Sequence, residues 1–434
     1  MLNIRLKPKQ PGHKLLKMSI KKQVDVLVIG AGPSGSIAAA ILHKSGLDVQ
    51  IVEKLRFPRF VIGESLLPRC MEALEEADLL EAVKAKNFQQ KFGAKFIWGD
   101  KLCDFNFSQQ YTPGWSWTWQ VPRAEFDKTL ADACEARGIP VHYETEVTGV
   151  EIHEDGTSTT TVKLADGSTE TINARFIVDG SGYGRVIPTL FGLNKPSTQY
   201  TRKAVFCHMQ DPHRKESVEP DRITIYVHNL KTWVWVIPFS SGITSVGYVG
   251  NPEFFDQYPG GPTEQFKAIL EAEPDLKKRF RDFEMAWEEP RHLQGWSATT
   301  DSFFGKGFVL TGNVTEFLDP VFSSGVTLAS VSAQKAANLV IRHLKGEQVD
   351  WTNDYMTQMQ MGVDVFRTFV NGWYDGTLFK IFFAEDRSEE MMNQICSVLA
   401  GYVWDDSNPF VKKSDKTVYA LARYIDAQSE QATV

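Results

Sequence analysis

Cysteine is scarce in this sequence of 434 residues, and the few cysteines lie far apart. They are Cys70, Cys103, Cys134, Cys207 and Cys396. No C-x-x-C pair or Cys/His cluster is present, so the sequence indicates neither a zinc site nor a disulfide framework, and we predict no metal site. Unpaired cysteines are typical of a reducing compartment, and we therefore expect a cytoplasmic protein.

Long apolar runs and long basic runs are also missing. A membrane-spanning helix needs about 18 or more consecutive apolar residues. No such run occurs, so we expect no membrane span. The net charge is −7, from 47 Lys and Arg against 54 Asp and Glu. Because no basic run crosses the body of the chain, the sequence disfavours a nucleic-acid partner.

The first 22 residues are the exception to this acidic balance. Residues 1–22 carry seven Lys or Arg and no acidic residue. Their apolar stretches are too short for the apolar region of a secretory signal peptide. The alternative, an arm that lies on a membrane surface, requires a longer amphipathic pattern. We therefore predict that residues 1–22 form a disordered basic leader.

A βαβ pattern follows this leader. Residues 24–30 (VDVLVIG) form a continuous apolar run, which is typical of a buried parallel strand. Residues 34–46 have helical composition and end at Gly46, and residues 48–54 form a second strand. Further helices are expected at residues 71–86, 123–138 and 326–346, and further buried strands at residues 140–144, 174–182 and 306–313.

A second pattern occupies residues 200–250, where apolar residues alternate with a period of two. Such alternation is typical of an antiparallel sheet. We therefore predict an α/β fold with α+β lobes, in which a Rossmann-like βαβ sheet is interleaved with an antiparallel sheet. Residues 23–350 would form one compact core with two lobes, and residues 351–434 a helical C-terminal part.

The turn after the first strand reads Gly30-Ala31-Gly32-Pro33-Ser34-Gly35. In a G-x-G-x-x-G turn the glycines allow a tight turn, close approach to a pyrophosphate and close helix packing, while the helix N-terminus offers N–H groups. Glu53 lies 23 residues after Gly30, where an acid can bind the ribose hydroxyls. We predict dinucleotide binding by Gly30, Gly32, Pro33, Ser34, Gly35, Glu53 and Lys54.

Three further strings resemble flavoproteins of the glutathione-reductase and aromatic-hydroxylase type. They are Ile177–Gly182 (IVDGSG), Leu310–Asn313 (LTGN) and the helix start at Arg123 (RAEFD). The resemblance implies FAD as the cofactor, bound also by Arg123, Asp179, Gly180, Gly312, Asn313 and Gly325. Asn313 departs from the Gly-Asp usual in that family, but an amide still donates and accepts hydrogen bonds.

Two strings narrow the resemblance to flavin-dependent halogenases. Residues 233–238 (WVWVIP) match the W-x-W-x-I-P motif, and the period of two places Trp233 and Trp235 on one face of a strand. Residues 317–325 (FLDPVFSSG) match F-x-x-P-x-x-S-x-G. The resemblance places substrate near Trp233, Trp235 and Pro238, and it places the halide at Ser323, Ser324 and Gly325.

A lysine completes the resemblance. Residues 57–65 (FPRFVIGES) and 90–99 (QKFGAKFIWG) are similar to halogenases that act on phenols and pyrroles, and Lys91 stands at their catalytic position. On a single strand Lys91 and Lys95 would share a face, so alternation alone does not choose between them. A lysine at this place either forms a haloamine or polarises hypohalous acid by hydrogen bonding, and the sequence leaves both open.

The resemblance implies an oxidoreductase that uses FADH2, O2 and chloride or bromide to form hypohalous acid. Lys91 would direct this oxidant to a phenol, resorcinol or pyrrole, either free or tethered to a carrier protein. Because a second dinucleotide motif for NAD(P)H is lacking, we expect a separate flavin reductase. The antiparallel sheet would bind substrate, and residues 351–434 would cover its pocket. The alternatives are an aromatic monooxygenase, a prenyl-chain reductase and a non-catalytic flavin-binding protein.

Overall fold

The computed structural model describes residues 19–196 and 200–432. Most of the predicted leader lies outside these ranges. Its last residues are described, and there the Lys21 ammonium pairs with the Asp48 carboxylate at 2.5 Å.

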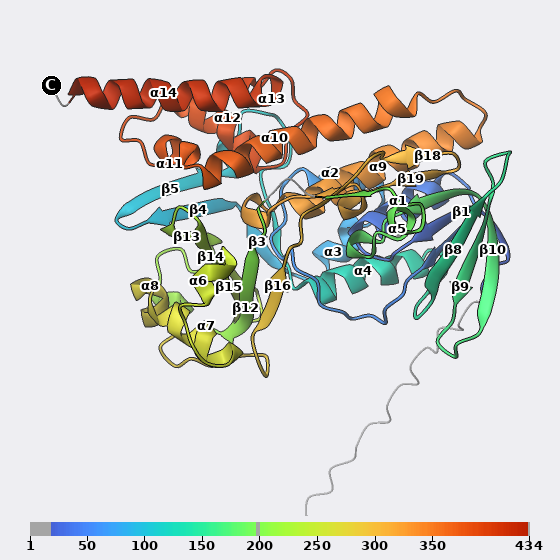
Figure 1. Cartoon of the computed structure of the whole chain (residues 1–434), viewed down its shortest axis with the longest axis horizontal. Helices are drawn as coiled ribbons and strands as arrows, with labels where there is room; N and C mark the ends of the chain where they lie inside the picture. The colour runs from blue at the N-terminus through green and yellow to red at the C-terminus, as the bar shows by residue number, and fades with distance from the viewer. Residues whose placement is uncertain (1–18, 197–199, 433–434) are drawn as a thin grey trace, which may run out of the picture.

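The first sheet is Rossmann-like and mostly parallel. Its main strands have the order β18-β19-β10-β1-β2-β7, and β8 and β9 extend β10 as an antiparallel ribbon (Figure 1). The strands are β1 (Gln23–Ile29), β2 (Val49–Val52), β7 (Val141–His142), β8 (Glu146–Ile152), β9 (Ser158–Lys163), β10 (Thr169–Asp179), β18 (Phe304–Gly305) and β19 (Phe308–Leu310). Four helices accompany it: α1 (Pro33–Lys44), α4 (Arg123–Glu135), α5 (Val186–Leu190) and α9 (Ser324–Leu344).

The second sheet is antiparallel except where β4 pairs with β13. Its order is β16-β12-β15-β14-β13-β4-β5. The strands are β4 (Gly93–Trp98), β5 (Lys101–Asn106), β12 (Lys203–Gln210), β13 (Thr224–Asn229), β14 (Thr232–Pro238), β15 (Ile243–Gly250) and β16 (Arg291–Gln294). Helices α6 (Pro252–Phe255), α7 (Pro262–Glu271) and α8 (Pro274–Arg279) pack on it. Because the chain alternates between the two sheets, the structure confirms the predicted interleaved α/β fold.

Short strands connect these two layers. Strand β3 (Gln89–Lys91) pairs with β6 (Thr118–Gln120), and β17 (Ala298–Thr300) lies between β11 (Asn194–Lys195) and β20 (Glu316–Phe317). After a π-helical turn, the C-terminal part is helical and lies along α9 and beside β4 and β5 (Figure 1). Its helices are α10 (Thr357–Tyr374), α11 (Thr377–Phe382), α12 (Glu389–Leu399), α13 (Pro409–Lys412) and α14 (Ser414–Ala432).

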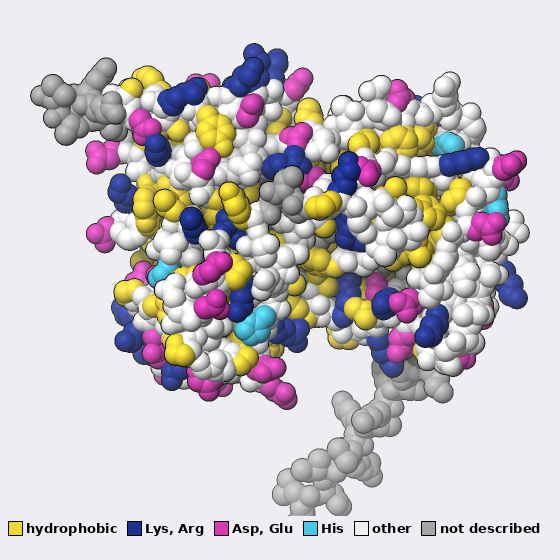
Figure 2. Space-filling model, viewed as in Figure 1, with side chains coloured by type: hydrophobic (Ala, Val, Ile, Leu, Met, Phe, Trp, Pro, Cys, Tyr) yellow, Lys and Arg dark blue, Asp and Glu magenta, His cyan; other side chains and the backbone are white. Residues whose placement is uncertain are grey.

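One large hydrophobic core joins the two sheets and the C-terminal helices. It contains Val28 of the first sheet, Trp235 of the second and Trp373 of α10. On the face shown in Figure 2, acidic and basic side chains are intermixed. Among the residues described, no helix is long and apolar enough to cross a bilayer. The same residues contain no group of His, Cys, Asp and Glu arranged to hold a metal ion.

The single helix predicted over residues 71–86 is wrong. The segment forms α2 (Cys70–Glu76) and α3 (Leu80–Lys84), separated at Asp78, whose φ is +55°. The Leu79 N–H donates to the Leu74 carbonyl, which is the bond that closes a Schellman cap. Aspartate tolerates this left-handed conformation better than most residues, so a helix end is hidden in a sequence of helical composition.

We expect Gly93→Ala to destabilise the fold strongly. A Cβ at Gly93 would lie 1.8 Å from the Phe105 carbonyl oxygen, where β4 meets β5. Overpacking of this kind costs about 1–3 kcal/mol. The matched control is Gly149→Ala in β8, where the nearest atom to an added Cβ is 3.8 Å away. Urea unfolding should show a large loss of unfolding free energy for Gly93→Ala alone. Equal values for the two variants would contradict this packing argument.

Candidate active site

A cavity of about 660 Å³ opens between the two sheets. Its volume lies within the range of roughly 300–1,000 Å³ that is usual for ligand sites. Most of the predicted site residues line it: Gly30, Gly32, Pro33, Ser34, Glu53, Lys54, Arg123, Gly180, Trp233, Trp235, Asn313, Ser323 and Gly325. The other predicted site residues lie behind the wall: Gly35, Lys91, Asp179, Pro238, Gly312 and Ser324.

The glycine turn brings three backbone segments together at one end of the cavity. Gly30 has a φ of +92°, and a Cβ there would lie 2.7 Å from the Gly180 carbonyl oxygen. A Cβ at Gly35 would lie 1.8 Å from the Gly30 carbonyl oxygen. Helix α1 begins here without a side-chain cap, so its first N–H groups are open toward the cavity. A phosphate fits this arrangement of uncapped donors.

Glu53 and Lys54 follow β2 at the cavity wall. The buried Glu53 carboxylate accepts hydrogen bonds from the backbone N–H groups of Ala31 and Leu55, both at 2.9 Å. It therefore fixes the glycine turn while it faces the cavity. Lys54 is exposed at the rim and pairs with Glu146 at 2.7 Å.

The buried Asp127 carboxylate holds two arginines at the cavity. Arg123 binds it through two hydrogen bonds of 2.8 and 3.0 Å, and Arg59 binds it at 2.8 Å. The Arg59 guanidinium reaches the glycine turn, since a Cβ at Gly32 would lie 3.4 Å from it. Arg59 also lines the cavity, although no motif in the sequence marks it as a binding residue. The one feature of the sequence that pointed to Arg59 was its position within residues 57–65 (FPRFVIGES), the segment similar to halogenases.

The two other glycine-containing strings, residues 177–182 and 310–313, reach the cavity through the loops that follow their strands. Asp179 points away from it and accepts hydrogen bonds from the N–H groups of Ser181 and Ile187, at 2.9 and 2.8 Å. Burial raises the pKa of this carboxyl. Asp179 therefore shapes the loop that presents Gly180. Likewise Gly312, with a φ of +61°, packs against Ala329, while the adjacent Asn313 lines the cavity.

The segment that resembles a halide site is a turn into a long helix. Helix α9 begins at Ser324, two residues before its predicted start, and Ser323 precedes it with a φ of +57°. No side chain caps this helix, so the first N–H groups lack an internal partner. Ser323 and Gly325 line the cavity, whereas Ser324 is buried behind them. A small anion fits these donors.

Upstream in this segment, Asp319 is a buried carboxylate. Its Oδ1 accepts from the Val321 N–H at 3.1 Å, and its Oδ2 accepts from the Tyr374 hydroxyl at 2.9 Å. Burial raises the pKa of Asp319 to about 6, although both hydrogen bonds oppose the shift. The turn therefore starts from a hydrogen-bonded carboxylate rather than from a solvent-exposed loop.

The two tryptophans of β14 form the opposite wall. The indole N–H of Trp235 donates to the Ser245 hydroxyl at 3.0 Å, and that of Trp233 donates to the Tyr374 hydroxyl at 2.9 Å. Pro238 lies at the end of the same strand, where its carbonyl accepts from the Gln120 side chain at 2.5 Å. Pro238 therefore ties β14 to β6 and does not face the cavity.

Lys91 and Lys95 lie on different strands. The chain leaves β3 at Lys91 and enters β4 at Gly93, so the shared face expected for one strand does not occur. Lys95 forms an ion pair with Glu219. The Lys91 ammonium is buried and donates to the Ser65 hydroxyl and the Leu66 carbonyl, both at 2.8 Å. Ser65 lines the cavity, so one hydroxyl separates Lys91 from it.

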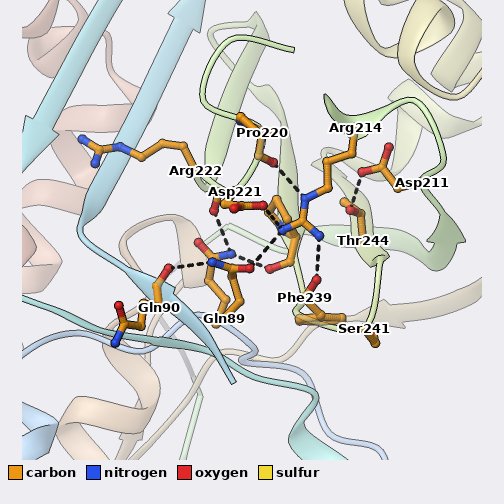
Figure 3. A network of polar contacts seen from close by, with 12 residues as sticks. Gln89, Gln90, Asp211, Arg214, Pro220, Asp221, Arg222, Phe239, Ser241 and Thr244 are labelled. Carbon is orange, nitrogen blue, oxygen red and sulfur yellow. Dashed lines mark hydrogen bonds and ion pairs between the residues drawn. The ribbon is translucent and has the colours of Figure 1, made fainter. Parts of the chain in front are cut away.

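A polar network fixes β3 relative to the tryptophan wall (Figure 3). Arg214 donates to the Gln89 side chain of β3 at 3.1 Å and to the Phe239 carbonyl, just after β14, at 2.6 Å. It also donates to the Pro220 carbonyl at 3.1 Å and pairs with Asp221. The strand that carries Lys91 is thus held at a set position beside β14.

We expect Arg59→Ala to weaken dinucleotide binding by about tenfold or more, because a charge-assisted hydrogen bond to phosphate contributes about 1.5–3 kcal/mol. The matched control is Arg56→Ala, an exposed arginine outside the cavity lining. Flavin fluorescence titration measures the two dissociation constants. If both variants bind FAD as the wild type does, Arg59 does not contact the cofactor.

The burial of Lys91 has a consequence for stability against pH. Burial lowers the pKa of its ammonium from 10.5 to about 7. The unfolded chain therefore binds more protons than the folded protein between pH 7 and 10.5, and this group makes stability rise with pH there. Denaturant unfolding of the wild type and Lys91→Met at pH 7 and pH 10 should show that the unfolding free energy of the wild type gains on that of the variant as the pH rises. Parallel pH curves would place the Lys91 pKa near its ordinary value.

Comparisons with known proteins agree with this geometry. A family model described as an FAD binding domain matches residues 23–358. A 1H-pyrrole-2-carbonyl-(peptidyl-carrier protein) chlorinase from Pseudomonas fluorescens is 29% identical over 374 residues, covering 81% of this chain and 82% of its own. The corresponding brominase from Pseudoalteromonas luteoviolacea is 26% identical over 399 residues, covering 89% and 94%.

A solved structure extends the similarity over nearly the whole chain. A protein described as a flavoprotein/dehydrogenase, from Cytophaga hutchinsonii, is 53% identical, with a TM-score of 0.91, and the match covers 94% of this chain and 100% of that one. The cofactor is therefore FAD, and the enzyme is an oxidoreductase. The chain belongs to the FAD-binding domain family and, within it, to the flavin-dependent halogenases.

Proposed function

We propose that the protein uses FADH2, O2 and chloride or bromide to halogenate an electron-rich aromatic ring. The observation that carries this proposal is the convergence of four features on one cavity. The glycine turn lies at one end, the uncapped start of α9 and the Trp233–Trp235 wall lie beside it, and Ser65 connects the cavity to Lys91. A plain flavin monooxygenase needs the first feature but has no use for the buried lysine.

FAD fits the first feature, since its pyrophosphate would meet the N–H groups of α1 and its ribose would meet Glu53. When bound, reduced FAD supplies the redox chemistry, in which O2 accepts two electrons from it and two from the halide, giving hypohalous acid and water. The chain's own residues bind the halide, exclude water and direct the product.

The halide would bind at Ser323, Ser324 and Gly325. There the backbone N–H groups of the first turn of α9 supply donors without a charged side chain. Hypohalous acid formed in the cavity then meets the Ser65 hydroxyl. This hydroxyl accepts a hydrogen bond from Lys91 and donates its own proton, so it can polarise the oxidant. Because Lys91 does not line the cavity, the geometry favours hydrogen bonding through Ser65 over a haloamine.

The cavity wall and the relatives both bear on the substrate. Beside the tryptophans the wall is aliphatic, with Ile223, Ile225 and Ile237, which suits a flat ring. Two relatives are named for a pyrrole carried by a peptidyl-carrier protein. We propose a phenol, resorcinol or pyrrole, free or carrier-tethered, with reduced flavin delivered by a separate reductase. All five cysteines are free and buried, which supports a reducing, cytoplasmic location.

The proposal predicts a halide-dependent product. Purified protein with FAD, a flavin reductase, NADH and air should convert members of a phenol and pyrrole panel to halogenated products, identified by isotope pattern in mass spectrometry. Omission of the reductase should abolish turnover. Lys91→Met and Ser65→Ala should each lose at least about 100-fold in rate, because Lys91 reaches the cavity through the Ser65 hydroxyl.

The matched control is Lys95→Met, which removes a lysine four residues away that pairs with Glu219. It should retain wild-type turnover, and all variants should retain FAD. Hydroxylated product formed without halide would establish a monooxygenase instead. Full activity of Lys91→Met would remove Lys91 from the mechanism.

A further inference from the structure

The C-terminal helices do not reach the cavity directly. Among the described residues, those that line the cavity end at Ala329, so none comes from the segment 351–434 that was predicted to cover the pocket. Side chains near the cavity nevertheless contact α10. Phe322 of the halide-binding segment packs against Phe369 and Trp373 of this helix. Trp233 of the tryptophan wall and Asp319 at the start of that segment both bind the same tyrosine hydroxyl.

This tyrosine is Tyr374, the last residue of α10. Its hydroxyl donates to Asp319 Oδ2 at 2.9 Å and accepts from Trp233 Nε1 at 2.9 Å. The Arg202 guanidinium lies over the tyrosine ring, 3.9 Å from its centroid. The hydroxyl is thus used as both donor and acceptor, and the ring is held by a cation. The side chain has one defined position.

The two partners of Tyr374 belong to two different parts of the site, the halide-binding turn and the tryptophan wall. Asp319 also accepts from the Val321 N–H at 3.1 Å, and this turn leads directly to Ser323 and Gly325. Trp233 lines the wall against which the aromatic substrate would lie. Both Asp319 and Trp233 are almost fully buried, so solvent does not offer either group a replacement partner.

We propose that Tyr374 is a positioning residue that sets the halide-binding turn relative to the Trp233 wall. This inference rests on the proposed function and deepens it. The C-terminal helices would then act on the cavity through this hydroxyl, beside the packing of Phe322 on α10, rather than by covering it. Loss of the hydroxyl leaves the Trp233 N–H without an acceptor and the Asp319 carboxylate without a donor, so the turn loses its fixed position.

The test compares Tyr374→Phe with Tyr419→Phe in the FAD-loaded enzyme. Tyr419 also donates its hydroxyl to a carboxylate, that of Asp375 at 2.8 Å, but it lies on the exposed side of α14 and outside the cavity lining. Tyr374→Phe should raise the halide KM by about tenfold, the effect of one lost hydrogen bond to a charged group. FAD affinity should stay close to the wild-type value, while the melting temperature should fall modestly because two buried groups lose a partner. Tyr419→Phe should change neither halide KM nor FAD affinity.

A second variant separates positioning from general destabilisation. Trp233→Phe removes the indole N–H, and Tyr374→Phe should have a smaller effect on halide KM in that background, because the two residues share one interaction. Equal halide KM in wild type, Tyr374→Phe and Tyr419→Phe would overturn the inference. A fall in FAD affinity as large as the fall in halide affinity would overturn it as well, since it would show that the whole site had loosened.

Halide binding measured without turnover distinguishes this inference from the proposed function. Bromide titration of the FAD-loaded protein, followed by flavin absorbance, should give a dissociation constant that Tyr374→Phe weakens by the same factor. If the wild type binds bromide and Tyr374→Phe weakens that binding, but no halogenated product forms, the inference holds and the proposed reaction fails. If the wild type halogenates while Tyr374→Phe binds bromide normally, only the inference fails. If the wild type binds no bromide, both fail.

Discussion

The site depends on a mutual close approach of three backbone segments. At the end of β1, a Cβ on Gly35 would lie 1.8 Å from the Gly30 carbonyl, one on Gly30 would lie 2.7 Å from the Gly180 carbonyl, and one on Gly180 would lie 2.9 Å from the Gly35 nitrogen. Side chains at these positions would push α1 away from the sheet. The N–H groups of α1, the Glu53 carboxylate and the loop at Gly180 then would not face a common cavity.

The second half of the site is fixed by side chains rather than by backbone contact. Asp127 joins Arg59 to Arg123, and Arg214 joins β3 to the end of β14. Arg123 and Asp127 both lie in α4, but Arg59 is 68 residues from Asp127 and Arg214 is 125 residues from Gln89. The last two bonds each close a gap between separate elements. A charged side chain that is buried among fixed partners holds its geometry, because breaking the bond would leave an unpaired charge in the interior.

Elements that depend on local pattern could be predicted from the sequence, and contacts between distant residues could not. The βαβ unit, the glycine turn and Glu53 follow from spacing within about 30 residues. The end of α2 just before Asp78 was missed, because nothing in the sequence indicates that this aspartate adopts a left-handed backbone conformation. Lys91 was separated from Lys95 by a change of sheet at Gly93. Tyr374 is 141 residues from Trp233 and 55 from Asp319, a pairing that no local pattern reveals.

The shared core has a consequence for the exchange of flavin. The chain passes back and forth between the two sheets, and one hydrophobic core extends through both. Moving the lobes apart would expose that apolar surface to water, at about 25 cal/mol for each Å². We therefore expect flavin to exchange past the rim of the cavity, where Lys54 and Leu55 lie, without separation of the two lobes.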